Sequence, residues 1–172
     1  MAAKSIKPLQ LLAFDADDLQ VLSAHMQDAL IRSGDMAFQP QARRFALVGS
    51  RFNWLAGDGR RHERRLTGMH FDHVVRVQRQ GFDPAQNDLM LNLLGIQFDP
   101  SETPEQAPAG SLVLTFSGGA SVRLEVECLE ASMLDMNPRW PTRRKPGHAL
   151  PKDALPKDAL AKSAPADTAE DE

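Results

Sequence analysis

Residues 57–73 hold the densest group of side chains that could do chemistry. In seventeen positions, the stretch GDGRRHERRLTGMHFDH has four arginines, three histidines, one glutamate and two aspartates. Guanidinium groups bind phosphates and carboxylates through paired hydrogen bonds, and histidines with carboxylates can hold a metal ion or move protons. The stretch could therefore contact an acidic partner or nucleic acid, form a metal or catalytic cluster, or be a solvated turn.

The arginines are the part of this stretch that we select as a binding surface. They follow GDG, a turn signal, which predicts that they lie at a hairpin tip or at strand ends. The candidate surface combines the basic segment Arg60–Arg65 with a second basic segment, the Trp140–His148 arm. Its binding residues would be Arg60, Arg61, Arg64, Arg65, Trp140, Arg143 and Arg144.

Two kinds of partner fit such a surface, and we favour a protein with an acidic surface. The same arginines could also grip phosphates, with Trp140 as a stacking platform, so a nucleic-acid-binding accessory protein is the alternative. No RNP-like aromatic motif, GXXG loop or zinc-finger spacing accompanies them. The net charge of -3 and pI near 5.9 argue against a whole protein committed to nucleic acid or to an anionic membrane.

The histidines give a further alternative, a small metal-dependent hydrolase. If residues 68–80 form one strand, His70 and Asp72 share a face, and a site could combine them with a distant residue. His73 then lies on the opposite, apolar face, where we interpret it as a hydrogen-bonded core histidine. Because three ligands do not converge, we expect no metal and no cofactor, and we favour a non-enzymatic protein.

Other chemistries find little support along the chain. There is no GxxxxGK[ST] or GxGxxG phosphate loop. The single cysteine excludes an internal disulfide, and we expect Cys128 to face inward on a strand as a small hydrophobe. The N-terminus lacks a signal-peptide pattern and no window approaches about 18 apolar residues, so we expect a cytoplasmic protein without membrane contact.

The clearest predicted element is an amphipathic helix after a short strand at 9–14. Asp15 is suited to be its N-cap, and Gly34 to be the residue that ends it. One stripe of this helix would hold Leu19, Leu22, Met26, Ala29 and Leu30.

Beyond Gly34 the apolar pattern changes to the two-residue period of strands. The apolar phase slips near Gly49 and Gly95, which predicts bulges that bend the sheet. A hairpin should turn at SGGA (117–120), and its second arm should place Val122, Leu124, Val126 and Cys128 inward. We expect strands at about 36–38, 45–55, 68–80, 89–98, 111–116 and 121–130.

These elements predict an α+β fold. One N-terminal amphipathic helix would pack on a strongly bent antiparallel sheet or partly open barrel, in the order β-α-β-β-β-β-β-β. We expect a globular domain over 1–137 and a Pro/Arg-rich extended arm over 138–149. A disordered low-complexity tail over 150–172, with PKDAL twice in tandem, would follow.

Charge is segregated along the chain. Residues 43–79 have a balance of +6, whereas residues 80–137 have a balance of -8. Cross-strand ion pairs between these segments would explain the asymmetry structurally, each worth about 0.2–1 kcal/mol. A dipolar surface whose basic side receives an acidic partner is the functional interpretation.

Two stretches resemble a known family. RRFALVGSRFNWL (43–55) and LTFSGGASVRLEVECLEA (114–131) are similar to a family of small bacterial proteins described as a domain of unknown function. The resemblance covers about Leu9 to His148, includes the W…RRKPGH arm and excludes the repeat tail. It implies a bacterial cytoplasmic protein of one domain, and it implies no activity, cofactor or catalytic residue.

Overall fold

The sheet and one helix account for most of the described chain. The computed structural model describes residues 7–54, 62–142 and 146–147. Within these ranges the elements are β1 (Gln10–Ala13), α1 (Ala16–Met26), β2 (Leu30–Gln39), β3 (Arg44–Phe52), β4 (His62–Phe71), β5 (Val74–Gln80), β6 (Met90–Pro100), β7 (Gly110–Phe116), β8 (Ser121–Val126) and β9 (Ala131–Thr142), with short 3-10 turns at Pro40–Ala42, Pro104–Gln106 and Ser117–Gly119.

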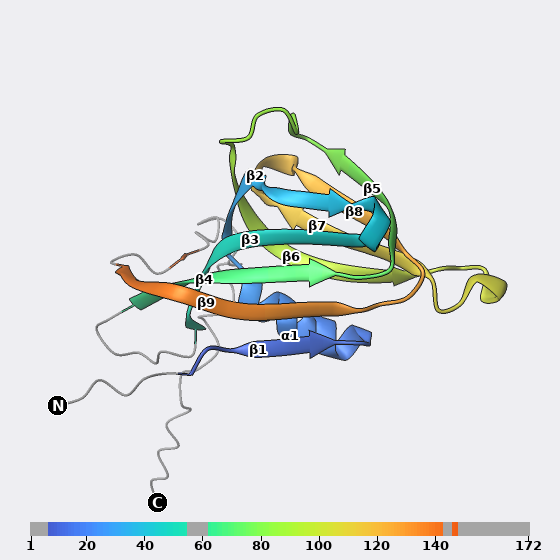
Figure 1. Cartoon of the computed structure of the whole chain (residues 1–172), viewed down its shortest axis with the longest axis horizontal. Helices are drawn as coiled ribbons and strands as arrows, with labels where there is room; N and C mark the ends of the chain where they lie inside the picture. The colour runs from blue at the N-terminus through green and yellow to red at the C-terminus, as the bar shows by residue number, and fades with distance from the viewer. Residues whose placement is uncertain (1–6, 55–61, 143–145, 148–172) are drawn as a thin grey trace, which may run out of the picture.

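The nine described strands form one antiparallel sheet that is folded over on itself but not closed. Their order across the sheet is β1-β9-β4-β3-β2-β6-β7-β8-β5, so β1 and β5 are its two edges. Helix α1 packs against β6, β1 and β3, and Figure 1 shows it beside β1 at the lower side of the bent sheet. The predicted α+β class, with an N-terminal helix on a strongly bent antiparallel sheet, is confirmed.

Helix α1 begins where the sequence predicts and ends earlier. The Asp15 carboxylate accepts a hydrogen bond from the Asp18 N–H at 2.8 Å, as an N-cap should. The helix stops at Met26, because the chain turns through a left-handed residue, Asp28 (φ 61°), whose N–H donates to the Leu93 carbonyl. The predicted extension to Gly34 was therefore wrong.

Residues 30–34 instead form the start of strand β2. Ala29 and Leu30 are not helical, and Gly34 lies inside the strand. A Cβ at Gly34 would stand 2.8 Å from the Asn87 carbonyl oxygen, so the glycine permits a close approach of two chain segments. A Gly-terminated helix and a glycine at a tight crossing look alike in one sequence.

The expected bulge at Gly49 lies in the neighbouring strand. Strand β3 pairs with β4 without interruption, whereas β2 shifts register between Ile31 and Met36. Gly49 faces Ile31, and a Cβ there would come within 2.7 Å of the Ile31 Cγ1. The apparent slip of the apolar phase has another cause, because the inward position that follows Gly49 is occupied by the buried Arg51.

The apolar pattern of the sequence predicted strands β6 to β8 more accurately. The register between β6 and β7 shifts at Leu93/Gly95, so the predicted irregularity near Gly95 is confirmed. The hairpin around 117–120 joins β7 to β8, and Val122, Leu124 and Val126 are buried as expected. Cys128 differs, because β8 ends at Val126 and the cysteine is half-buried beyond it.

Two strands were missed. The predicted strand 68–80 is the end of β4 and the whole of β5, since the chain turns at His73, whose φ is 59°. Val74 is then buried and Val75 exposed, so the apolar face on which His73 was expected, which would include Val75, does not continue along β5. Strand β9 runs over Ala131–Thr142 and pairs with both β1 and β4, so residues 138–142 of the expected arm continue a strand of the sheet.

Candidate interaction surface and the ion network behind it

The candidate surface lies at one end of the β4–β9 pair. His62 pairs with Thr142, and Arg64 pairs with Trp140. The expected binding residues Arg60, Arg61, Arg143 and Arg144 lie outside the described residues. Of the other expected binding residues, Trp140 is half-buried in β9. Arg64 and Arg65 lie in β4, and both form hydrogen bonds within their own chain.

Arg64 is engaged by backbone carbonyls. Its Nη1 donates to the Ser50 carbonyl at 2.8 Å and lies 3.4 Å from the Asp28 carbonyl. Burial lowers the pKa of this guanidinium, and the nearby Asp28 charge acts in the opposite direction. Arg64 therefore serves to hold β4 against β3 and the turn after α1.

Arg65 points into the fold. Its side chain is 4 % exposed, and its Nε donates to the Glu63 carboxylate at 2.6 Å. Its Nη1 lies 3.7 Å from Asp135. Consecutive strand residues face opposite sides of a sheet, so Arg64 and Arg65 do not share one face.

Arg65 belongs to a buried ion network centred on Asp135. Arg51, 1 % exposed, donates from Nε and Nη2 to the two carboxylate oxygens of Asp135, at 2.7 and 2.6 Å. Thr67 Oγ1 donates to the same carboxylate at 2.9 Å, and the Leu9 N–H donates to it at 3.0 Å. Four donors thus satisfy one buried carboxylate, which links β1, β3, β4 and β9.

The network favours the charged form of Asp135. Burial alone would raise the pKa of Asp135, but the hydrogen bonds from Arg51 and the Leu9 N–H hold that pKa below its ordinary value. Nearby, burial and then the Arg51 charge lower the pKa of His25, on the last turn of α1, while the Asp135 charge opposes them. The His25 Nδ1 is buried and has no hydrogen-bond partner in the described part of the chain.

His70 and Asp72 meet, but as part of a surface ion pair. The His70 Nε2 lies 3.3 Å from Asp72, whose two oxygens also accept from Arg44 at 2.6 and 3.2 Å. His73 is half-exposed and pairs with Glu130 at 2.9 Å, so its expected place in the core was wrong. Across the ranges that the structure covers, no three His, Cys, Asp or Glu side chains form a metal-binding group.

Two further features bear on catalysis. The thiol of Cys128 has its pKa raised by burial and then by the charges of Glu130 and Glu127, which disfavours the nucleophilic thiolate.

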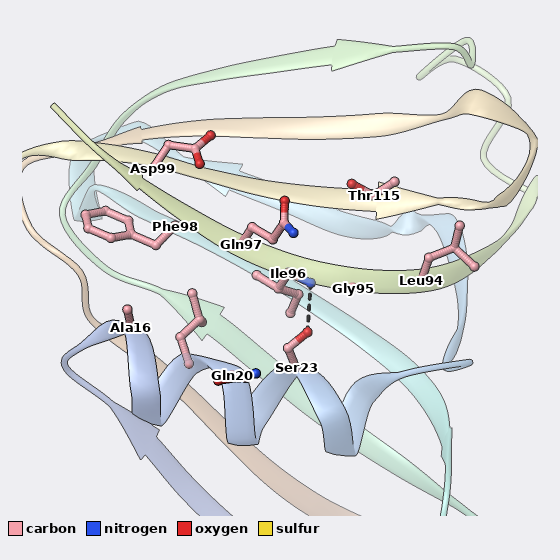
Figure 2. Close-up of a pocket in the computed structure, with 11 residues that line it drawn as sticks. Ala16, Gln20, Ser23, Leu94, Gly95, Ile96, Gln97, Phe98, Asp99 and Thr115 are labelled. Carbon is pink, nitrogen blue, oxygen red and sulfur yellow. Dashed lines mark hydrogen bonds between the residues drawn. The ribbon is translucent and has the colours of Figure 1, made fainter. Parts of the chain in front are cut away.

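A groove of about 810 Å³ runs between α1 and β6. In Figure 2, Ser23 reaches from α1 to the β6 backbone, where its Oγ accepts from the Ile96 N–H at 2.8 Å. Asp99 is the one ionisable residue among those that line the groove, so the lining holds no acid–base pair.

Sequence reasoning missed the buried network. The signal for Arg51 was present, because a charged residue occupies the inward parity of an otherwise apolar strand. Asp135 carries the same signal, as the one charged residue in the inward positions of residues 131–135. Nothing in the sequence alone says that these two residues, 84 positions apart, are partners.

Comparisons with known proteins give one match. A family model described as "Protein of unknown function (DUF2948)" matches residues 9–148. No curated protein and no solved structure matches the chain. Within the described residues, no helix combines the length and the apolar character that crossing a membrane requires.

Proposed function

The chain belongs to the DUF2948 family of proteins of unknown function, and we propose that it is a non-enzymatic, cytoplasmic protein–protein interaction module. Its contact surface is the basic end, which we define as the end of the β4–β9 pair with Arg60, Arg61, Trp140, Arg143 and Arg144. The partner offers an acidic surface.

The register of β4 and β9 is the observation that supports this surface. His62 pairs with Thr142. Arg61 directly precedes His62 in the chain, and Arg143 directly follows Thr142. Two basic stretches that are more than 80 positions apart in the sequence are therefore both joined to the sheet at one cross-strand pair.

The charges around this end support an acidic partner. The inward arginines Arg51 and Arg65 are balanced by Asp135 and Glu63. Arg60, Arg61, Arg143, Arg144 and Lys145 add a basic excess to a chain of net charge -3. Such an excess raises the rate at which an acidic surface finds the basic end.

A protein partner is favoured over nucleic acid because two of the predicted phosphate contacts are used internally. Arg64 donates to the Ser50 carbonyl and Arg65 to Glu63. The remaining arginines are enough for a carboxylate cluster, whereas each arginine that is used internally reduces the electrostatic attraction on which affinity for nucleic acid depends.

A direct titration tests the proposal. A fluorescent poly-glutamate peptide of about 20 residues and a single-stranded RNA of equal length would each be titrated with the full chain at several salt concentrations. We expect micromolar binding of the peptide that weakens with salt. The Arg60→Ser/Arg61→Ser and Arg143→Ser/Arg144→Ser variants should each weaken it at least about fivefold, since each removes two charge-assisted contacts.

The matched control removes the same charge elsewhere. Arg43 and Arg76 are exposed and form surface pairs with Glu127 and Glu125, so the Arg43→Ser/Arg76→Ser variant should change peptide affinity less than about twofold. RNA binding at least tenfold tighter than peptide binding would replace the proposal by the nucleic-acid alternative. Binding of neither probe at low salt, or equal loss in the control, would show that the basic end is not the contact surface.

A further inference from the structure

Strand β1 has one backbone edge that no described strand pairs with. The Asp135 N–H donates to the Leu9 carbonyl at 2.9 Å, and the β1–β9 register runs from Gln10↔Leu134 to Ala13↔Ala131. N–H and C=O groups alternate in direction along a strand, so Leu9, Leu11 and Ala13 bond to β9. The N–H and C=O groups of Gln10 and Leu12 consequently point away from the sheet.

No described strand covers this edge. Strand β1 is one of the two edge strands of the sheet, and Figure 1 shows it along the lower margin of the sheet. The side chains beside the edge are apolar and exposed, with Leu12 at 52 %, Phe14 at 59 % and Leu134 at 45 %. Leu12 lies opposite Ser132, which makes Leu134 its diagonal neighbour on the same face.

The other edge strand of the sheet, β5, differs from β1 because charged side chains protect it from pairing with another strand. Strand β5 carries the charged side chains Arg76 and Arg79 within its seven residues, a usual way to prevent edge-to-edge pairing. Strand β1 has no charged residue between Gln10 and Ala13. An uncharged edge flanked by exposed apolar side chains is a template for another strand.

We propose that two copies of this chain pair edge to edge through β1, antiparallel, about a two-fold axis at Leu11. Gln10 then lies opposite Leu12 of the second copy, and the same pair forms a second time by symmetry. In each pair the two residues exchange two backbone hydrogen bonds, from the N–H of each to the C=O of the other. Leu12, Phe14 and Leu134 of each copy lie on the same face of the joined sheet, on both sides of the new junction. This dimer goes beyond the proposed function and involves a different part of the molecule.

Charge complementarity selects a second copy as the occupant and sets the register. With the axis at Leu11, Lys7 of one copy lies opposite Asp15 of the other, and both side chains are exposed. The same pair forms twice by symmetry. Pro8 has no N–H to donate, so it ends the hydrogen-bonded edge on that side.

Sedimentation equilibrium over about 1–200 µM, the range suited to a small interface, tests the association. We expect a reversible monomer–dimer equilibrium in the full chain. The Gln10→Pro variant should raise the dimer dissociation constant at least tenfold, because it removes an N–H that points away from β9 and leaves the β1–β9 ladder intact. Leu94→Ser, which removes an exposed apolar side chain on β6, should leave that constant unchanged.

Engineered cysteines test the register even if Gln10→Pro disturbs the fold. In a Cys128→Ser background, Gln10→Cys and Leu12→Cys proteins would be oxidised separately and as a mixture. Opposed residues are about 5.5 Å apart between Cα atoms, within reach of a disulfide, whereas two copies of the same position are about 8 Å apart. The mixture should therefore form the mixed disulfide at least fivefold faster than either protein alone.

Three results would overturn the dimer. The chain could remain monomeric at every concentration, the Leu94→Ser control could dissociate as strongly as Gln10→Pro, or both cysteine proteins could crosslink as fast alone as together. The first result would leave β1 as an edge for a different partner, and the last would indicate random collision.

Discussion

The ion pair of Arg51 and Asp135 is the feature that most constrains this fold at the scale of single residues. Both side chains are almost fully buried, and the pair is bidentate. A buried carboxylate with four donors tolerates its burial only while those donors remain. The network therefore holds the strands in a set arrangement at the end of the sheet where the basic stretches attach.

Removing one partner of this pair should be strongly destabilising. We expect Arg51→Met to lower the free energy of unfolding by about 3–5 kcal/mol, because Asp135 would be left buried with its main counter-charge absent. Urea denaturation at pH 7 measures the change. The double variant Arg51→Met/Asp135→Leu should recover part of it, since neither charge then remains.

The exposed pair Arg76–Glu125 provides the control for that measurement. Arg76→Met should cost at most about 1 kcal/mol, as is usual for a surface ion pair. Equal costs for Arg51→Met and Arg76→Met would mean that the buried pair adds nothing beyond a surface contact.

His25 should make stability depend on pH. Its pKa in the folded protein lies below the ordinary value of about 6.5, because of burial and the Arg51 charge. Protonation therefore favours the unfolded chain, so the stability that neutral His25 supports is present above that value and is lost as the pH falls below it.

Comparing wild type with His25→Gln between pH 7.5 and pH 5 isolates this effect. The free energy of unfolding of the wild type should fall more steeply over that window than that of the variant, because the other titratable groups are common to both. Parallel curves would show that His25 does not titrate differently in the folded and unfolded chains.

At the scale of elements, the crossing of β2 and β3 depends on Gly49. The register of β2 shifts between Ile31 and Met36, and Ile31 is fully buried directly against Gly49. On β3, only Ser50 separates Gly49 from Arg51. A displacement of β3 at Gly49 would therefore also move the buried ion pair of Arg51 with Asp135.

Gly49→Ala should destabilise the fold by about 1–3 kcal/mol, as overpacking does, since the new Cβ would lie 2.7 Å from the Ile31 Cγ1. Gly95→Ala is the matched control, because the nearest atom to its Cβ, the Ser23 Oγ, is 3.7 Å away. Thermal and urea denaturation of both variants would decide. A cost at Gly95 as large as that at Gly49 would point to backbone flexibility instead of packing.

At the scale of the whole molecule, the boundary of the folded unit is the open question that β9 raises. The sequence suggests a domain over 1–137, whereas β9 continues to Thr142 and pairs with β4 to its end. The family match extends further, to residue 148. We therefore expect the stable unit to include the whole of β9.

Two truncations test that boundary. A chain ending at residue 148 should keep its free energy of unfolding within about 0.5 kcal/mol of the full chain, because the sequence predicts a disordered low-complexity tail after that point. A chain ending at residue 137 should be clearly less stable, because it loses the β4–β9 pairs from Arg65↔Arg139 to His62↔Thr142. Differential scanning calorimetry compares the two truncated chains with the full chain. Equal unfolding temperatures for all three would support a domain that ends at residue 137.

Features that depend on neighbouring residues could be predicted from the amino-acid sequence. The Asp15 cap, the turn at 117–120 and the irregularity at Gly95 depend on residues close together in the chain, and all three could be predicted. The α+β class followed from the same local periodicities. Prediction was weaker where one local pattern has two physical causes, as with Gly34 and Gly49.

Contacts between residues far apart in the sequence become visible only in the folded chain. The pairing of Arg51 with Asp135, the engagement of Arg64 and Arg65 within the chain, and the register of His62 with Thr142 join positions distant in sequence. Burial, ion pairing and strand register depend on the summed packing of the whole sheet. A charged residue on an apolar face therefore shows in the sequence that something unusual is buried, and its partner appears only once the strands are side by side.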